Sequence, residues 1–137
     1  MPGDLILLVE DDPDDEELVV SCMDENDIAR IHAVHDGIEA LSYLHGGERE
    51  LPRAVLLDLK LPKISGLEVL RRIRAHPRTE LLPVVIMTSS KQDSDKLSSY
   101  RGGANSFVTK PIDFDQFREA VRQLGLYWAG LNETAEL

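Results

Sequence analysis

Five short apolar runs recur along the chain, and the segments between them carry the signals of amphipathic helices. The runs cover residues 5–9, 31–34, 53–58, 83–87 and 106–109. Continuous apolar runs of this length are typical of strands that are buried on both faces of a sheet. Strands that alternate with helices form a parallel sheet with right-handed crossovers and helices on both faces. The pattern therefore predicts a doubly wound α/β fold of five strands and five helices.

Residues that favour helix starts follow these runs. Asp12 is expected to cap the first helix, with Pro13 at its first position. Asp36 and Ser65 each stand three residues before a glutamate, which is the spacing of a capping box. Asp113 is expected to open the last helix. These signals place a helix after each strand and leave no interior linker, so we expect one domain over residues 1–137.

Charge and composition exclude several classes of partner. The chain has 15 Lys and Arg against 25 Asp and Glu, a formal net charge of −10. Such a charge disfavours direct binding to nucleic acid or to an anionic membrane. No apolar run approaches the roughly 20 residues of a membrane span, and no signal peptide is visible. Cys22 is the single cysteine, so an internal disulfide is excluded and a cytoplasmic location is expected.

Chemically active side chains follow the carboxyl ends of four predicted strands. Glu10 and Asp11 follow the first run, and Asp58 stands at the end of the third. Thr88 and Lys110 follow the fourth and fifth runs. In an open doubly wound sheet, these strand ends line the crevice in which ligands bind. We therefore expect the five side chains to meet in one site.

The residue types at this site favour phosphoryl transfer with a metal ion. Three neighbouring carboxylates, Glu10, Asp11 and Asp58, repel one another, so at least one should have a raised pKa. Oxygen ligands without His or Cys suit Mg²⁺ or Mn²⁺ rather than Zn²⁺. Lys110 and Thr88 would then hold the oxygens of a tetrahedral anion on Asp58, as phosphoryl transfer requires.

These residues and their spacing resemble the receiver domains of two-component response regulators, over about residues 4–124. The resemblance implies a flavodoxin-like (βα)5 sheet with strand order 2-1-3-4-5. It implies that Asp58 accepts a phosphoryl group from a partner histidine kinase, with Mg²⁺ or Mn²⁺ held by Glu10, Asp11, Asp58 and the backbone carbonyl of Lys60. A chain of this kind is not an enzyme, because it catalyses only its own phosphorylation and dephosphorylation.

The same resemblance implies a conformational switch. Thr88 would move toward the phosphoryl group, and Phe107 would follow into the vacated space, so that phosphorylation shifts the population between two packings. Many relatives have Tyr at the position of Phe107, and the Phe ring lacks that hydroxyl. Lys60 and Ser90 occupy the positions that control phosphoryl lifetime in the family. The sequence leaves open whether the Lys110–Pro111 bond is cis.

Two further stretches indicate which kind of response regulator the chain resembles. The segment 56–63, LLDLKLPK, resembles response regulators that partner phytochrome-type histidine kinases. A tail over about residues 125–137 extends the last helix, and no residues remain for a DNA-binding domain, so a stand-alone receiver is expected. The last helix and the tail carry more apolar side chains than one face can bury. They predict a homodimer through the last strand, the last helix and the tail, unless Trp128 folds back onto its own domain. The interface candidates are Phe117, Leu124, Tyr127, Trp128 and Leu131.

Three other hypotheses share part of this pattern. A phosphatase of the haloacid-dehalogenase type would use Asp58 as its nucleophile, but it needs a second aspartate where Lys60 stands. A flavodoxin-like FMN binder needs a phosphate loop after the first strand, and acidic residues 10–12 would repel that phosphate. The third hypothesis is a receiver-like binding module that takes no phosphoryl group. The complete set of functional residues argues against it.

Overall fold

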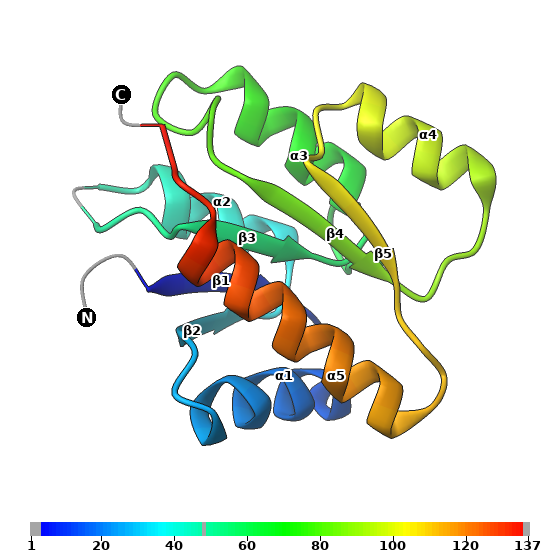
Figure 1. The fold of residues 1–137 in the computed structure, drawn as a ribbon. Helices are drawn as coiled ribbons and strands as arrows, with labels where there is room; N and C mark the ends of the chain where they lie inside the picture. The colour runs from blue at the N-terminus through cyan, green and yellow to red at the C-terminus, as the bar shows by residue number, and fades with distance from the viewer. Residues whose placement is uncertain (1–3, 48, 136–137) are drawn as a thin grey trace.

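The apolar runs form one parallel five-stranded sheet with the order β2-β1-β3-β4-β5 (Figure 1). The computed structural model describes residues 4–47 and 49–135. The chemistry-bearing strands β1, β3 and β4 are buried along their whole length, because helices cover both faces of the sheet. The predicted fold and strand order are confirmed. The strands are β1 (Leu5–Val9), β2 (Arg30–Val34), β3 (Ala54–Leu57), β4 (Val84–Thr88) and β5 (Ser106–Thr109).

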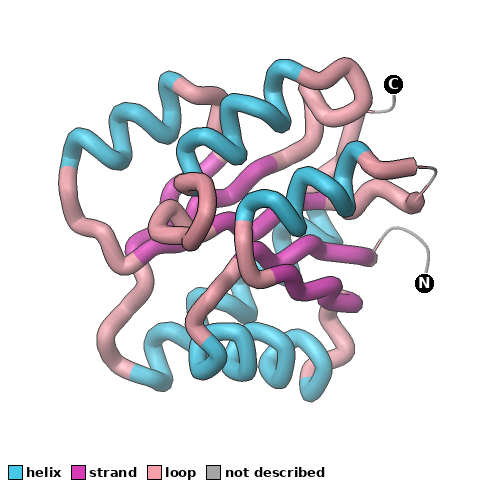
Figure 2. The backbone as a smooth tube through the Cα atoms, turned by 180° about the vertical axis from the view of Figure 1, so that it is seen from behind, coloured by secondary structure: helices cyan, strands magenta, loops and turns pink. Residues whose placement is uncertain are grey.

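Helices lie on both sides of this sheet, with α1 and α5 together on one side and α2, α3 and α4 on the other (Figures 1 and 2). The predicted caps at Asp12, Asp36, Ser65 and Asp113 all form, since each side chain accepts a backbone N–H of its helix's first turn. The helices are α1 (Pro13–Glu25), α2 (Gly37–His45), α3 (Gly66–Ala75), α4 (Asp93–Arg101) and α5 (Phe114–Gly125).

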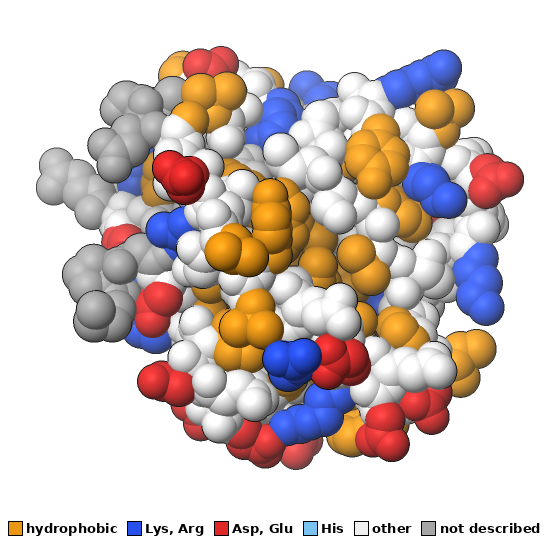
Figure 3. All heavy atoms as spheres, in the orientation of Figure 1, with side chains coloured by type: hydrophobic (Ala, Val, Ile, Leu, Met, Phe, Trp, Pro, Cys, Tyr) orange, Lys and Arg blue, Asp and Glu red, His pale blue; other side chains and the backbone are white. Residues whose placement is uncertain are grey.

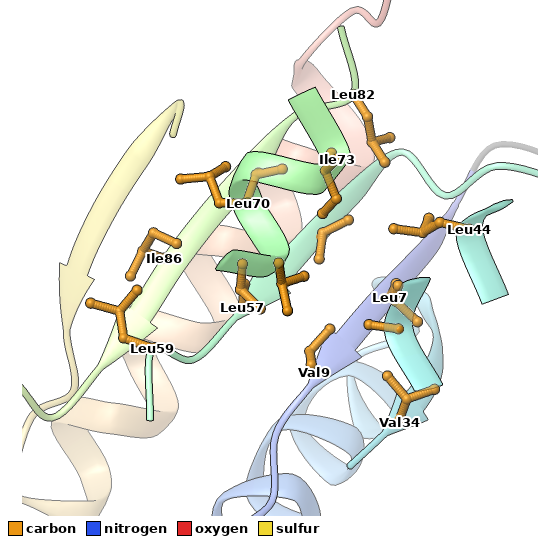
Figure 4. Close-up of a cluster of buried hydrophobic side chains, with 14 residues drawn as sticks. Leu7, Val9, Val34, Leu44, Leu57, Leu59, Leu70, Ile73, Leu82 and Ile86 are labelled. Atoms are coloured by element: carbon orange, nitrogen blue, oxygen red, sulfur yellow. The ribbon is translucent and has the colours of Figure 1, made fainter. Parts of the chain in front are cut away.

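Two apolar layers fill the space between the sheet and its helices. One layer joins the sheet to α2 and α3, and Figure 4 shows Leu57, Leu70 and Ile73 meeting within it. The other joins the sheet to α1 and α5. Phe117 belongs to this second layer and is only 6% exposed. Its assignment as an interface candidate is therefore wrong, because its side chain is used in the core.

The last helix continues directly into a π-helical segment, η1 (Leu126–Leu131). Trp128 packs partly against the layer between α1, α5 and the sheet. After η1 the backbone carbonyl of Asn132 accepts a hydrogen bond from the Arg53 guanidinium. All peptide bonds between described residues are trans, Lys110–Pro111 included. Within the described part of the chain, no helix has the length and apolar character needed to cross a bilayer.

Candidate functional site

Three of the predicted site residues, Glu10, Asp58 and Lys110, stand one position beyond their strands, and Thr88 is the last residue of β4. Sheet hydrogen bonds still hold the backbone at the first three. The amide of Glu10 donates to the carbonyl of Val34 at 3.0 Å. The amide of Asp58 donates to the carbonyl of Val9 at 3.2 Å. The amide of Lys110 donates to Thr88 at 2.7 Å. The sheet thus fixes where each functional side chain leaves the backbone, and all of them leave at one edge.

Lys110 is the centre of this site. Its ammonium lies 2.7 Å from Glu10 Oε1, 2.8 Å from Asp15 Oδ2 and 2.9 Å from Asp58 Oδ2. An ammonium has three N–H donors, so each donor has its own carboxylate. Lys110 is only 8% exposed, and the contacts therefore form in a region of low dielectric, where charge pairing is strong.

Burial and charge shift the pKa values of the two most enclosed groups. Burial raises the pKa of Glu10 to about 7, because the lowering effect of Lys110 does not cancel it, and the charge of Asp58 raises it further. Burial by itself would lower the pKa of Lys110, but its hydrogen bonds to Asp15, Glu10 and Asp58 outweigh burial and raise it. A raised carboxylate pKa was expected, although burial rather than repulsion is its main cause.

The acidic cluster has the composition of a site for a hard divalent cation. Ligand oxygens of Glu10, Asp11 and Asp58 lie within 4.8 Å of one another. Glu10 and Asp58 are buried, whereas Asp11 is exposed, so the cluster opens to solvent on one side. All its ligand atoms are carboxylate oxygens, which suits Mg²⁺ or Mn²⁺. Lys60 lies at the same edge, and its amide donates to Asp58 Oδ1 at 3.2 Å.

Gly66 allows the start of α3 to lie directly against the Asp58 backbone. A Cβ at this position would lie 2.2 Å from the carbonyl oxygen of Asp58 and 2.6 Å from the Cα of Leu59. The Gly66 amide donates to the carbonyl of Leu59 at 2.9 Å. Any larger residue would push the loop that carries Asp58, so glycine is required here by close backbone approach.

Thr88 and Ser90 form a second hydrogen-bonded group beside the acidic cluster. Thr88 is fully buried, and its hydroxyl oxygen accepts the amide of Ser90 at 3.3 Å. The Ser90 hydroxyl donates to the carboxylate of Asp95 on α4. Phe107 is half-buried and packs against the layer under α2 and α3. Among the described residues, no hydrogen bond links the Thr88 hydroxyl to Asp58 or Lys110.

A family model described as the response regulator receiver domain matches residues 6–122. This chain belongs to that family. The matched range includes every catalytic, metal and switch residue predicted from the sequence. It also includes every buried member of the two apolar layers.

Individual relatives match this receiver domain over most of their length. A probable methanogenesis regulatory protein, FilR2 of Methanothrix harundinacea, is 40% identical over 134 residues, covering 95% of this chain and 86% of FilR2. The crystal structure of Mn²⁺-bound response regulator Rcp1 has a TM-score of 0.89 and 30% identity, covering 97% and 99% of the two chains. The phosphorylated cyanobacterial phytochrome response regulator RcpA has a TM-score of 0.90 and 29% identity, covering 98% and 99%.

One member of this receiver site was not singled out from the sequence. Asp15 lies in the first turn of α1, where the helix dipole alone explains an acidic residue. Its contact with Lys110 spans 95 positions of the chain. Nothing in the local pattern distinguishes Asp15 from Asp14 beside it. Only the folded structure, in which the first turn of α1 lies beside the Lys110 ammonium, shows which of the two faces the site.

Proposed function

We propose that this receiver domain accepts a phosphoryl group on Asp58 from a histidine kinase, with Mg²⁺ or Mn²⁺ in the acidic cluster, and changes its partner binding as a result. The meeting of Lys110 with Glu10 and Asp58 carries the proposal. A buried lysine beside a carboxylate nucleophile and a cation site is the set of groups that phosphoryl transfer needs.

In this mechanism, a carboxylate oxygen of Asp58 attacks the phosphorus of a phosphohistidine. The O–P bond forms as the P–N bond breaks, and the leaving imidazole takes up a proton from water. Lys110 places positive charge beside the phosphoryl oxygens. A divalent cation, when held by Glu10, Asp11, Asp58 and the backbone carbonyl of Lys60, would supply further positive charge at the same oxygens.

The switch would begin at Thr88. Its oxygen accepts the Ser90 amide, so the hydroxyl proton is available to a phosphoryl oxygen. A shift of Thr88 would open space toward half-buried Phe107, which would then move inward. Lys60 and Ser90 would influence phosphoryl lifetime, because Lys60 is exposed beside Asp58 and Ser90 is bonded to Thr88.

We also propose a phytochrome-type histidine kinase as the partner. The segment 56–63 and the similarity to RcpA support this choice. A cytoplasmic location fits the one free thiol, Cys22. The formal net charge of −10 argues against nucleic acid or an anionic membrane as a partner.

The test of phosphoryl transfer uses phosphoramidate, a small donor with the same P–N bond. We expect the intact mass to rise by one phosphoryl group in the presence of Mg²⁺, and not in its absence. Asp58→Asn should abolish the gain, whereas Asp93→Asn, an exposed aspartate on α4, should leave it unchanged. A gain that persists in Asp58→Asn would contradict the proposal. Hydrolysis of a general phosphate ester would instead support the phosphatase hypothesis.

A homodimer through β5, α5 and η1 is the second part of the proposal. A hollow of about 390 Å³ lies between β5, α5 and η1, lined in part by Val108, Leu124 and Trp128. Tyr127 also lines the hollow and is 47% exposed. Leu131, at the end of η1, is 76% exposed. Figure 3 shows hydrophobic side chains gathered on this face. An exposed apolar surface with aromatic side chains is typical of a protein interface.

Light scattering at tens of micromolar tests the dimer, with and without a phosphoryl mimic. We expect the wild-type mass to be that of two chains in at least one condition, and Leu131→Glu to reduce it to one. Leu81→Glu replaces a leucine that is 53% exposed in the α3–β4 connection and serves as the control. A monomeric wild-type mass in both conditions would exclude this dimer.

A further inference from the structure

Asp15 differs from the other carboxylates around Lys110 because it lies outside the candidate cation site. Its amide donates to the capping side chain of Asp12 at 3.2 Å, which fixes the start of α1. Its own carboxylate lies 2.8 Å from the Lys110 ammonium, with the side chain 24% exposed. Among the described residues, the oxygens close enough to share one cation come from Glu10, Asp11 and Asp58, and not from Asp15.

The other two acceptors of Lys110 have competing roles. Glu10 belongs to the cation cluster, and Asp58 is both a member of that cluster and the proposed nucleophile. Oxygens that bind a cation or carry a phosphoryl group are less available to an ammonium. Asp15 is therefore the one acceptor of Lys110 whose charge the proposed reaction leaves unused. A lysine side chain is a flexible four-carbon chain, and it loses substantial conformational entropy when its ammonium group is held in one place.

We infer that Asp15 is a positioning residue, which holds the Lys110 ammonium so that one N–H stays directed at the oxygens on Asp58. This inference rests on the proposed phosphoryl transfer and adds a residue to it. Without the Asp15 carboxylate, the ammonium would lose its independent anchor and would sample positions away from the phosphoryl oxygens. Misplacement of a catalytic charge slows a reaction even when every reacting group is present.

A matched pair of variants separates this role from simple loss of charge. Asp15→Asn removes the charged acceptor of Lys110. Asp14→Asn removes the same charge from the same helical turn, at an exposed side chain that forms no ion pair with any described residue. Asp15→Glu keeps the carboxylate and should recover function. The thermal unfolding of each variant shows whether the fold is retained.

The first measurement needs neither metal nor phosphoryl donor. The ¹H–¹⁵N signal of the Lys110 ammonium, assigned by its loss in Lys110→Met, should be visible in the wild-type protein because the group is buried and fully bonded. We expect this signal to broaden strongly in Asp15→Asn. It should persist in Asp14→Asn and in Asp15→Glu. A signal that is unchanged in Asp15→Asn would overturn the inference.

The second measurement is the rate of phosphorylation by phosphoramidate at saturating Mg²⁺. We expect Asp15→Asn to react roughly tenfold more slowly than the wild-type protein, and Asp14→Asn to stay within about twofold. If Asp15→Asn loses the ammonium signal but reacts at the wild-type rate, Asp15 has only a structural role. If the wild-type protein takes no phosphoryl group, the proposed function fails, and the ammonium signal still reports separately on the contact.

Discussion

Lys110 and Arg74 are two enclosed cations at opposite edges of the sheet, and they are held by different kinds of acceptor. Lys110 binds three carboxylates at the carboxyl ends of the strands. Arg74, at the end of α3, donates to neutral oxygens in the loops that precede β4 and β5. These are the backbone carbonyls of Thr79, Glu80, Leu82 and Gly103 and the side-chain oxygen of Asn105.

The kind of acceptor determines which edge of the sheet can change state. A carboxylate can bind a proton, a cation or a phosphoryl group, and each event alters its attraction for Lys110. A backbone carbonyl has no comparable alternative, so we expect Arg74 to keep the same partners when the site changes state. Burial lowers the pKa of Arg74, but guanidinium remains charged in proteins. One edge of the sheet is therefore suited to exchange partners, and the other holds two loops in place.

The largest expected effect on stability comes from Arg74→Met. This variant leaves several loop carbonyls without their donor, and we expect the free energy of unfolding to fall by about 4 kcal/mol. The loss should be the same in EDTA and in Mg²⁺, because no Arg74 partner belongs to the acidic cluster. Urea unfolding measures it, with exposed Arg101→Met as the control. A loss that Mg²⁺ restores would break the contrast between the two edges.

Lys110→Met should show the opposite dependence on metal. Removing the ammonium leaves Glu10, Asp15 and Asp58 without compensation, and in EDTA we expect a loss of about 3 kcal/mol. Saturating Mg²⁺ should reduce this loss to below about 1 kcal/mol, because the cation neutralises the same carboxylates. Paired urea titrations in EDTA and Mg²⁺ measure the difference. An equal loss in both conditions would mean that cation binding does not compensate for the missing ammonium.

The raised pKa of Glu10 predicts a smaller effect, which depends on pH. Its pKa is 4.5 in the unfolded reference and about 7 in the folded protein, so the folded state binds the proton more tightly. This tighter proton binding stabilises the folded protein at pH values below the unfolded pKa. The stabilisation is lost as pH rises through the folded pKa. In EDTA, the free energy of unfolding should fall by about 2 kcal/mol as pH rises from 5 to 7 and Glu10 loses its proton. Glu10→Gln should remove this component, as urea titrations across pH would reveal.

The smallest expected effect lies at the Arg74 edge and has the opposite sign. Burial, followed by the charges of His76 and Arg78, lowers the pKa of His45. His45 also bonds the Thr79 hydroxyl at 2.9 Å, beside the loop that Arg74 holds. Its stabilisation is present above the ordinary value of 6.5 and is lost as pH falls through the folded pKa. Titration of the His45 ring by NMR should give a value below 6.5, and a value above it would contradict this prediction.

Local pattern alone was enough to predict the sheet and most of its functional edge. The apolar runs and the capping residues, such as Asp12 and Ser65, act within a few positions of the chain, so their effects can be read in sequence. The parallel topology then brings every strand end to one edge. The sequence pattern is therefore sufficient to assign Asp58 and Lys110 to one site.

Tertiary packing alone decided the features that depend on distant partners. The sequence pattern places Phe117 on the apolar face of an amphipathic helix. Only the packing of α5 against the sheet shows that its side chain is buried. Asp14 and Asp15 are equivalent by pattern, yet only Asp15 contacts Lys110. Arg74 reaches carbonyls up to 29 positions away. Helical and strand periodicity specify which face a residue occupies, whereas its contact partner depends on how separate elements pack, and that information is spread over the whole chain.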